Sequence, residues 1–203
     1  MLIVVRHGNT FEAGVQPRRI GARTDLPLTV DGVEQARALG RHFVKLGWQF
    51  ERALVSPLQR TRHTADEILA QQDAPPVAQS AEFLREVDHG PDENKPEASI
   101  IARIGESALN AWDREAEVPP GWIVEPGARL AQWGKLFDEM HTFDAPTLLV
   151  TSNGAARFAL LADPHLLTEA SNLPSLKLPT GGYGIITRDG TQKLSIEAWG
   201  VRP

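Results

Sequence analysis

Short apolar runs rich in β-branched residues alternate along this chain with segments of helical periodicity, and this alternation limits the folds that the chain can adopt. Such runs are typical of central strands that are covered on both faces of a sheet. The expected strands are LIVV (2–5), ALVS (53–56), TLLVT (147–151), YGIIT (183–187) and the more alternating LSIEAW (194–199). Strands that alternate with helices predict an α/β fold in three layers, a mostly parallel sheet with helices on both faces.

Helical patterns fill the segments between these strands. The expected helices are 28–47, 56–71, 97–114 and 127–141, and LLVTSNGAARFAL (148–160) has the pattern of a buried strand that runs into a further helix. Thr29 is the expected N-cap of the first helix. In the second, we expect Ser56 as the cap and Pro57 at the first helical position. Asp189 and Gly190 predict a hairpin between the last two strands, so one edge of the sheet should be antiparallel.

The composition is that of an ordinary globular protein without thiol chemistry. Of the 203 residues, 41% are hydrophobic and 23% are charged. This size predicts a single domain over residues 1–203. The absence of cysteine excludes disulfides, thiol catalysis and thiolate metal sites. The apolar run at 2–5 is too short for a signal peptide, and no stretch reaches the roughly 20 apolar residues of a membrane helix. We therefore expect a cytoplasmic protein with no membrane partner.

Charge is spread unevenly over the chain. The net charge is −5, yet residues 1–62 carry nine Arg and one Lys against five Asp and Glu. A basic third within an acidic protein favours a local anion site over a surface for nucleic acid, and scattered surface charge is the alternative explanation. We expect no nucleic-acid partner. The sequence leaves open whether the chain forms a homo-oligomer.

Polar residues that suit a phosphate site follow three of the expected strands. They are Arg6, His7, Gly8, Asn9 and Thr10 after the first strand, Ser56 and then Arg60 after the second, and Ser152, Asn153 and Gly154 after the third. Ligands of an open α/β sheet bind at the carboxyl ends of its strands, so we expect these side chains to converge there.

Such a group can transfer a phosphoryl group. A neutral imidazole is a good nucleophile, and two nearby guanidinium groups disfavour its protonation. The same arginines can bind phosphate oxygens through charge-assisted hydrogen bonds. Gly8 would let the backbone approach the anion closely. A leaving alkoxide needs a proton, so a carboxylic acid should lie near.

Four stretches in order resemble one known family. Residues 6–10 are similar to the R-H-G-x-T motif of the histidine phosphatase superfamily, the phosphoglycerate mutase-like group. GARTDLPLTVDGVEQARALG (21–40) resembles its G-x-x-D-x-P-L-T-x-x-G-x-x-Q-A segment. VSPLQRTRHTA (55–65) resembles its S-x-L-x-R-x-x-x-T-A helix start, and LREVDHG (84–90) resembles its L-x-E-x-x-x-G segment. The resemblance runs from residue 3 to about residue 160.

This resemblance implies a phosphoglycerate mutase-like fold and a metal-independent phosphomonoesterase with a small phosphorylated substrate. It implies that His7 is phosphorylated in turnover and that Glu86 is the acid that later activates water. The implied phosphate-binding residues are Arg6, Arg60, Asn9, Thr10, Gly21, Asn153 and Gly154. We expect no cofactor and no metal. A mutase, which returns the phosphoryl group to a second hydroxyl, is the alternative activity.

Two departures from the family pattern leave a further alternative. Asn153 stands where the family's S-H-G segment has a second histidine, so the chain is either a weakened enzyme or a phosphate-binding regulatory module. GPDENKPE (90–97) retains Glu93 but lacks the aromatic residue that relatives often carry. Asp88 and Glu93 compete with Glu86 for the role of the acid.

Several basic side chains near this pattern have no assigned role. Arg18, Arg19 and Arg23 either bind a second anionic group of the substrate or form a solvated run of charge. Among the remaining histidines, His63 is expected nearest to the pocket, because it follows Arg60 by three positions.

Overall fold

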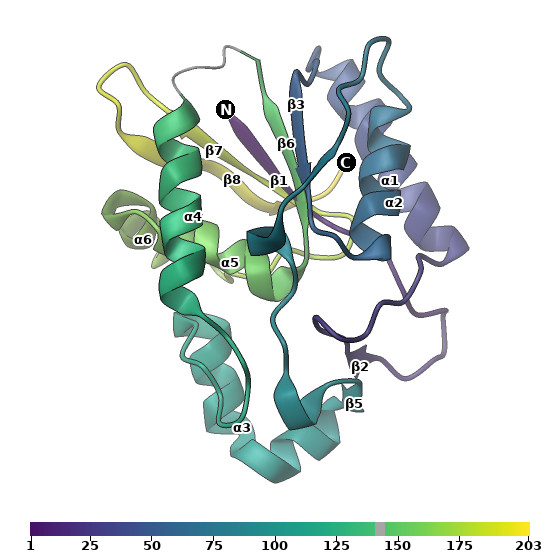
Figure 1. The fold of residues 1–203 in the computed structure, drawn as a ribbon, viewed down its shortest axis with the longest axis vertical. Coiled ribbons are helices and arrows are strands. Elements are labelled where there is room, and N and C mark those ends of the chain that lie inside the picture. The colour runs from purple at the N-terminus through teal and green to yellow at the C-terminus, as the bar shows by residue number, and fades with distance from the viewer. Residues whose placement is uncertain (141–144) are drawn as a thin grey trace.

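The structure is a computed structural model that describes residues 1–140 and 145–203. Its main sheet has the strand order β4-β3-β6-β1-β7-β8 (Figure 1). The strands are β1 (Leu2–Arg6), β3 (Arg52–Val55), β4 (Gln79–Ser80), β6 (Thr147–Thr151), β7 (Tyr183–Arg188) and β8 (Leu194–Val201). The first four are parallel, whereas β7 and β8 run antiparallel at one edge. The predicted α/β sheet, mostly parallel and with an antiparallel edge, is confirmed.

Helices cover both faces of this sheet. They are α1 (Val30–Lys45), α2 (Gln59–Leu69), α3 (Glu97–Glu115), α4 (Pro126–Glu139), α5 (Asn153–Leu161) and α6 (Pro164–Ala170). Figure 1 shows α1 and α2 on one side of the sheet and α4, α5 and α6 on the other. The helix α3 extends below the sheet, as does a small sheet of β2 (Arg18–Arg19) and β5 (Lys95–Pro96). Two short 3₁₀ helices, η1 (Glu82–Leu84) and η2 (Gly90–Asp92), lie between β4 and β5.

The core consists of two layers that β1 separates. Successive side chains of a strand point to opposite faces. Ile3 and Val5 therefore join one cluster with residues of α1 and α2, whereas Leu2 and Val4 join the cluster on the other face. All four side chains are at most 2% exposed. Burial of both faces explains why this strand is apolar throughout.

The ends of the helices agree with the sequence in one case and differ in two. Thr29 is the N-cap of α1, as predicted, because its Oγ1 accepts from Gly32 N–H at 3.1 Å. The prediction for Ser56 and Pro57 is wrong, because α2 begins at Gln59, whose N–H donates to the remote Asp25 Oδ1 at 2.8 Å. The helix expected at 127–141 begins at residue 126, and residue 141 lies outside the described residues.

Several short elements had no sequence signal. Two-residue strands such as β2, β4 and β5 are too short for an alternating pattern, and α6 has seven residues. The 19-residue helix α3 is kinked at Gly105, which has a φ of 82°. In the described residues, no helix is both long enough and apolar enough to cross a bilayer.

Candidate active site

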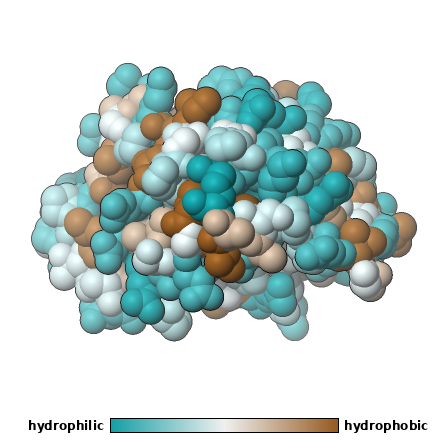
Figure 2. Space-filling model, turned by 90° about the horizontal axis from the view of Figure 1, so that it is seen from below, coloured by the Kyte–Doolittle hydropathy of each residue, from teal (hydrophilic) through white to brown (hydrophobic). Residues whose placement is uncertain are grey.

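The candidate site lies at the carboxyl ends of β1 and β6. His7 N–H donates to Thr151 O at 3.1 Å, which joins the two strand ends. Beside them is a cavity of about 770 Å³ whose walls include Arg6, His7, Glu86 and Asn153. Seen from the end of the molecule that carries α3, the surface is mostly hydrophilic, with a small group of hydrophobic side chains near its centre (Figure 2).

His7 is held in one tautomer. Its Nδ1 lies 2.8 Å from Gly8 O, which only accepts hydrogen bonds, so Nδ1 carries the proton and Nε2 carries a lone pair. Arg60 Nε–H donates to that Nε2 at 3.2 Å. The side chain is 4% exposed. Burial, and then the charges of Arg60 and Arg6, hold the pKa of His7 well below its usual value, so the imidazole is neutral at neutral pH.

The buried Arg60 and the partly buried Arg6 are both fixed by backbone carbonyls. Arg60 is 0% exposed, and its Nη1 and Nη2 donate to Thr24 O at 2.7 Å and Gly21 O at 3.2 Å. Arg6 Nη1 donates to Leu178 O at 2.7 Å. Burial lowers the pKa of Arg6 to about 10, so it remains a cation at neutral pH. The positive charges of Arg6 and Arg60 therefore both act on the His7 imidazole, and a backbone carbonyl holds each guanidinium in place.

Glu86 is held by two backbone N–H groups. Val87 N–H donates to Oε1 at 2.9 Å and Gly154 N–H donates to Oε2 at 3.0 Å. Burial alone would raise the pKa of Glu86, but the charge of His89, the two N–H donors and Arg60 outweigh it and lower the pKa. The carboxyl group is therefore ionised at neutral pH when the site holds no anion.

The structure brings most of the predicted residues to this cavity. Residues that line it together with His7 and Glu86 include Arg6, Asn9, Thr10, Asn153 and Gly154, and Arg60 joins them through its bond to His7. Gly21 does not line the cavity. Its carbonyl holds Arg60, and a side chain there would run into Val87, His89 and Glu93. In this structure Gly21 reaches the site through Arg60, and its expected role in the phosphate pocket stays a prediction.

Two other glycines have structural roles of their own. A side chain at Gly8 would run into the backbone of Gly32 at the start of α1, so helix packing alone already requires a glycine here. The N–H of Gly154 is taken by Glu86. Gly154 thus orients the carboxylate and has no free N–H for phosphate.

Asn153 presents an amide to the cavity at the first position of α5. Its Oδ1 accepts from Leu178 N–H at 2.9 Å. Leu178 O holds Arg6, so this single residue orients both side chains. Because Oδ1 is occupied, the NH₂ group is the end of Asn153 that can donate to a ligand.

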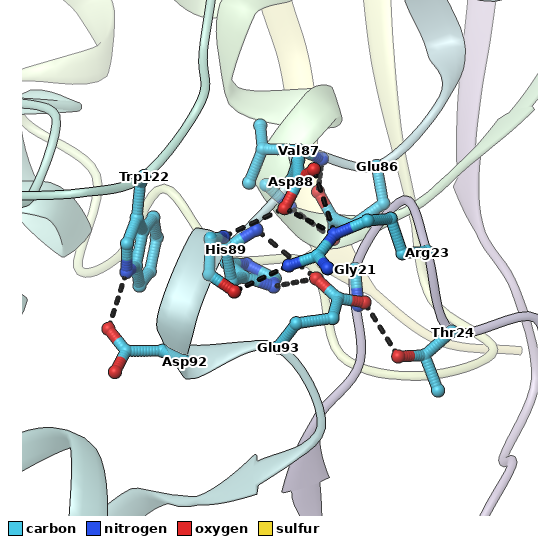
Figure 3. A network of polar contacts seen from close by, with 12 residues as sticks. Gly21, Arg23, Thr24, Glu86, Val87, Asp88, His89, Asp92, Glu93 and Trp122 are labelled. Carbon is cyan, nitrogen blue, oxygen red and sulfur yellow. Dashed lines mark hydrogen bonds and ion pairs between the residues drawn. The ribbon is translucent and has the colours of Figure 1, made fainter.

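The two carboxylates that competed with Glu86 are tied to neighbouring segments (Figure 3). Asp88 Oδ2 pairs with Arg23 Nε at 2.9 Å. Glu93 Oε1 accepts from Gly21 N–H at 2.7 Å and Thr24 Oγ1 at 2.6 Å. These bonds, with those from His89, outweigh burial and lower the pKa of Glu93 to about 2. Neither carboxylate lies free beside His7.

Of the basic groups without an assigned role, Arg18 and Arg19 line the cavity, whereas Arg23 does not. The expectation for His63 is wrong. It is exposed on α2, where its Nε2 lies 3.3 Å from Glu67 Oε1.

Several cavity residues were missed by the sequence analysis, among them His89, Asp113, Arg157 and Lys177. His89 is 3% exposed, and its Nδ1 lies 3.6 Å from Glu93 Oε2. Its ring packs edge-on against the ring of Trp122, with 4.4 Å between the two ring centres. No sequence signal beyond its nearness to Glu86 could have found it. Arg157 and Asp113 also line the cavity. Arg157 follows Asn153 by one helical turn, and this spacing was a usable signal. Within the described ranges, no group of three or more metal-ligating side chains could hold a metal ion.

The fold and this arrangement place the chain in one family. The family model of the histidine phosphatase superfamily (branch 1) matches residues 2–201. The chain therefore belongs to the histidine phosphatase superfamily, and the resemblance seen in four short stretches extends over almost the whole chain.

The sequence is similar to those of mutases, and the fold is similar to the solved structures of phosphatases. A 2,3-bisphosphoglycerate-dependent phosphoglycerate mutase of Methylobacterium sp. (strain 4-46) is 34% identical, over 89% of this chain and 88% of the relative. Among solved structures, a mycobacterial glucosyl-3-phosphoglycerate phosphatase has a TM-score of 0.78 at 19% identity, over 100% and 99% of the two chains. The α-ribazole phosphatase of Shigella flexneri has a TM-score of 0.69 at 21% identity, over 99% and 96%. These two structures support the fold.

Proposed function

We propose that this protein is a metal-independent phosphomonoesterase that acts through a phosphohistidine on His7. The observation that carries the proposal is the bond from Nδ1–H to Gly8 O, which makes Nε2 the nitrogen that bears the lone pair. Arg60 Nε–H donates to this lone pair, so that hydrogen bond must pass to a phosphoryl oxygen before Nε2 attacks. A neutral buried imidazole with an oriented nucleophilic nitrogen is what attack on phosphorus requires. Arg6 and Arg60 stabilise the negative charge on the oxygens of the phosphoryl group in the transition state of its transfer.

The proposed reaction has two steps. In the first, Nε2 forms a bond to phosphorus while the bond to the leaving oxygen breaks, and Glu86 gives that oxygen a proton. In the second, Glu86 takes a proton from water, whose oxygen attacks phosphorus and releases inorganic phosphate and His7. The bound phosphate dianion raises the pKa of the nearby Glu86 carboxyl, so Glu86 takes up from the solvent the proton that it gives to the leaving oxygen in the first step.

Asn153 takes the position of the family's second histidine in this proposal. Its NH₂ group donates to the phosphoryl group but carries no positive charge. The loss of one donor to a transition-state oxyanion costs about 10²- to 10³-fold in rate, and the exchange of a cationic donor for a neutral one costs at most that order. Asn153 therefore slows the enzyme without abolishing its chemistry.

Phosphotransfer to a second hydroxyl is the alternative, and the mutase relatives favour it. It uses the same phosphohistidine and differs only in the acceptor, an alcohol in place of water. In either case the substrate is a small phosphorylated molecule. We also propose that residues 1–203 form one domain, because both core layers share the β1 strand.

The test is hydrolysis of an aryl phosphate between roughly pH 5 and pH 8 with a chelator present. We expect activity in the wild type, a loss of about 10⁴-fold or more in His7→Ala, and wild-type activity in His165→Ala. His165 is exposed on α6, away from the cavity, and is the matched control. Equal rates in His7→Ala and the wild type would contradict the proposal, and a rate that depends on added metal would exclude the metal-independent route.

A further inference from the structure

The cavity has room for much more than a phosphoryl group. Beyond His7 and Asn153 it continues to a second group of polar residues, which we call the outer triad: Asp113, Arg157 and Lys177. Trp112 also lines the cavity there. The reaction proposed above uses none of these side chains.

Arg157 carries a donor without a partner. It lies one turn after Asn153 on α5, so the two side chains share one face of that helix. Its guanidinium lies 4.3 Å from the centre of the Trp112 ring, and its Nη1 donates to Trp112 O. The side chain is 1% exposed, and among the described residues nothing accepts a hydrogen bond from Nε–H.

Asp113 carries the matching acceptor without a partner. Its Oδ2 is 2.5 Å from Lys177 Nζ. Its Oδ1 is 3.8 Å from Arg157 Nη2, too far for a hydrogen bond, and within the described part of the chain it accepts none. The Asp113 side chain is 23% exposed, which leaves the carboxylate room to turn toward the cavity.

An unmet donor and an unmet acceptor on two neighbouring side chains favour one kind of ligand group. Buried polar atoms in native proteins are almost always paired, so these two atoms indicate an absent partner. A hydroxyl has both the donor that Asp113 Oδ1 lacks and the acceptor that Arg157 Nε–H lacks. A carboxylate or a second phosphate only accepts and would meet the negative charge of Asp113.

We propose that the outer triad binds a hydroxyl group of the substrate, which makes the preferred substrate a polyhydroxylated, sugar-type phosphomonoester. The chain also connects the triad to the phosphate pocket. Lys177 precedes Leu178, which holds both Arg6 and Asn153. A substrate can therefore place its phosphate at His7 and a hydroxyl at the triad. This inference rests on the proposed phosphatase function.

The experiment compares two phosphates of similar size, one of which has a sugar ring with its hydroxyl groups and ring oxygen, whereas the other has a plain cyclohexane ring. Glucose 6-phosphate and cyclohexylmethyl phosphate are assayed as substrates, with 3-phosphoglycerate as the carboxylate probe. We expect kcat/KM to favour the sugar by about tenfold, the effect of one or two hydrogen bonds to charged groups. Asp113→Asn should lower that preference severalfold. Asp138→Asn, on the exposed side of α4 and away from the cavity, is the matched control and should leave it unchanged.

The direction in which Asp113→Asn changes kcat/KM for each substrate distinguishes hydroxyl binding from anion binding at the outer triad. If the triad binds anions, removal of the Asp113 charge raises kcat/KM for 3-phosphoglycerate and leaves the sugar preference as it was, which would overturn the inference. Lys177→Met supplies a second test, because this side chain is 46% exposed and its replacement does not threaten the fold. Lys177→Met should also lower the preference for glucose 6-phosphate over cyclohexylmethyl phosphate.

Calorimetry on His7→Ala distinguishes failure of the inference from failure of the proposed function. Sugar-selective binding that depends on Asp113 supports the triad even if no phosphate is hydrolysed. Hydrolysis of both phosphates without selectivity, or equal binding of both by His7→Ala, rejects the triad and leaves the phosphatase proposal standing.

Discussion

The inner and outer parts of the cavity are built differently. In the inner pocket, which we define as Arg6, His7, Arg60, Glu86 and Asn153, every side chain is held by at least one backbone N–H or carbonyl group. In the outer triad, Arg157 donates to the backbone carbonyl of Trp112, whereas the side chains of Asp113 and Lys177 are held by the ion pair between them. The difference shows that the fold itself fixes the proposed chemistry, whereas substrate preference depends on a few side chains that can change without disturbing the sheet.

After the loss expected for His7→Ala, the largest effect in the inner pocket is expected at Glu86, which supplies the proton for the leaving group. Glu86→Gln keeps the shape of the side chain and can still accept from Gly154 N–H, but it cannot transfer a proton. We expect kcat for an alkyl phosphate to fall by about 10³-fold, with a smaller loss for an aryl phosphate, whose leaving group needs less protonation. Glu106→Gln, at an exposed position of α3, is the control. Equal losses for both substrates would show that Glu86 is not the acid.

A gain is expected at Asn153. Asn153→His restores a cationic donor to the phosphoryl group, so we expect turnover of an aryl phosphate to rise by about tenfold, within the range for one oxyanion donor. Asn172→His, at an exposed position after α6, controls for an added imidazole. An unchanged or lower rate would mean that the bond from Leu178 N–H to Asn153 Oδ1 matters more than the missing charge.

A smaller effect on stability is expected at Glu93, which supports the inner pocket through Gly21. Its pKa is lowered from 4.5 to about 2, so its contribution to stability is fully present above about pH 4.5 and is lost as the pH falls toward 2. Glu93→Gln should therefore lower the free energy of unfolding at neutral pH. As the pH falls from about 5 to 3, the free energy of unfolding should also decrease less steeply in this variant than in the wild type. Urea denaturation at several pH values measures both. A parallel decline in variant and wild type would exclude this role.

The contrast between the two parts of the cavity also explains which site residues could be predicted from the sequence and which could not. His7 and Arg60 were found because they follow apolar strands, whose local pattern fixes where they end. The start of α2 was misplaced because Asp25, from a remote segment, binds its first N–H. The outer triad was missed because it joins residues of α3 and α5 to the segment before β7, and only the tertiary fold brings these together.

The most direct test of the central claim is to trap the phosphoryl group. The wild-type protein is mixed with an aryl phosphate, quenched in base to preserve phosphohistidine, digested and analysed by mass spectrometry. The account predicts a phosphoryl group on the peptide that contains His7, formed as fast as the aryl alcohol is released and absent from His7→Ala. Hydrolysis without any phosphoryl group on His7, or with one on another residue, would contradict it.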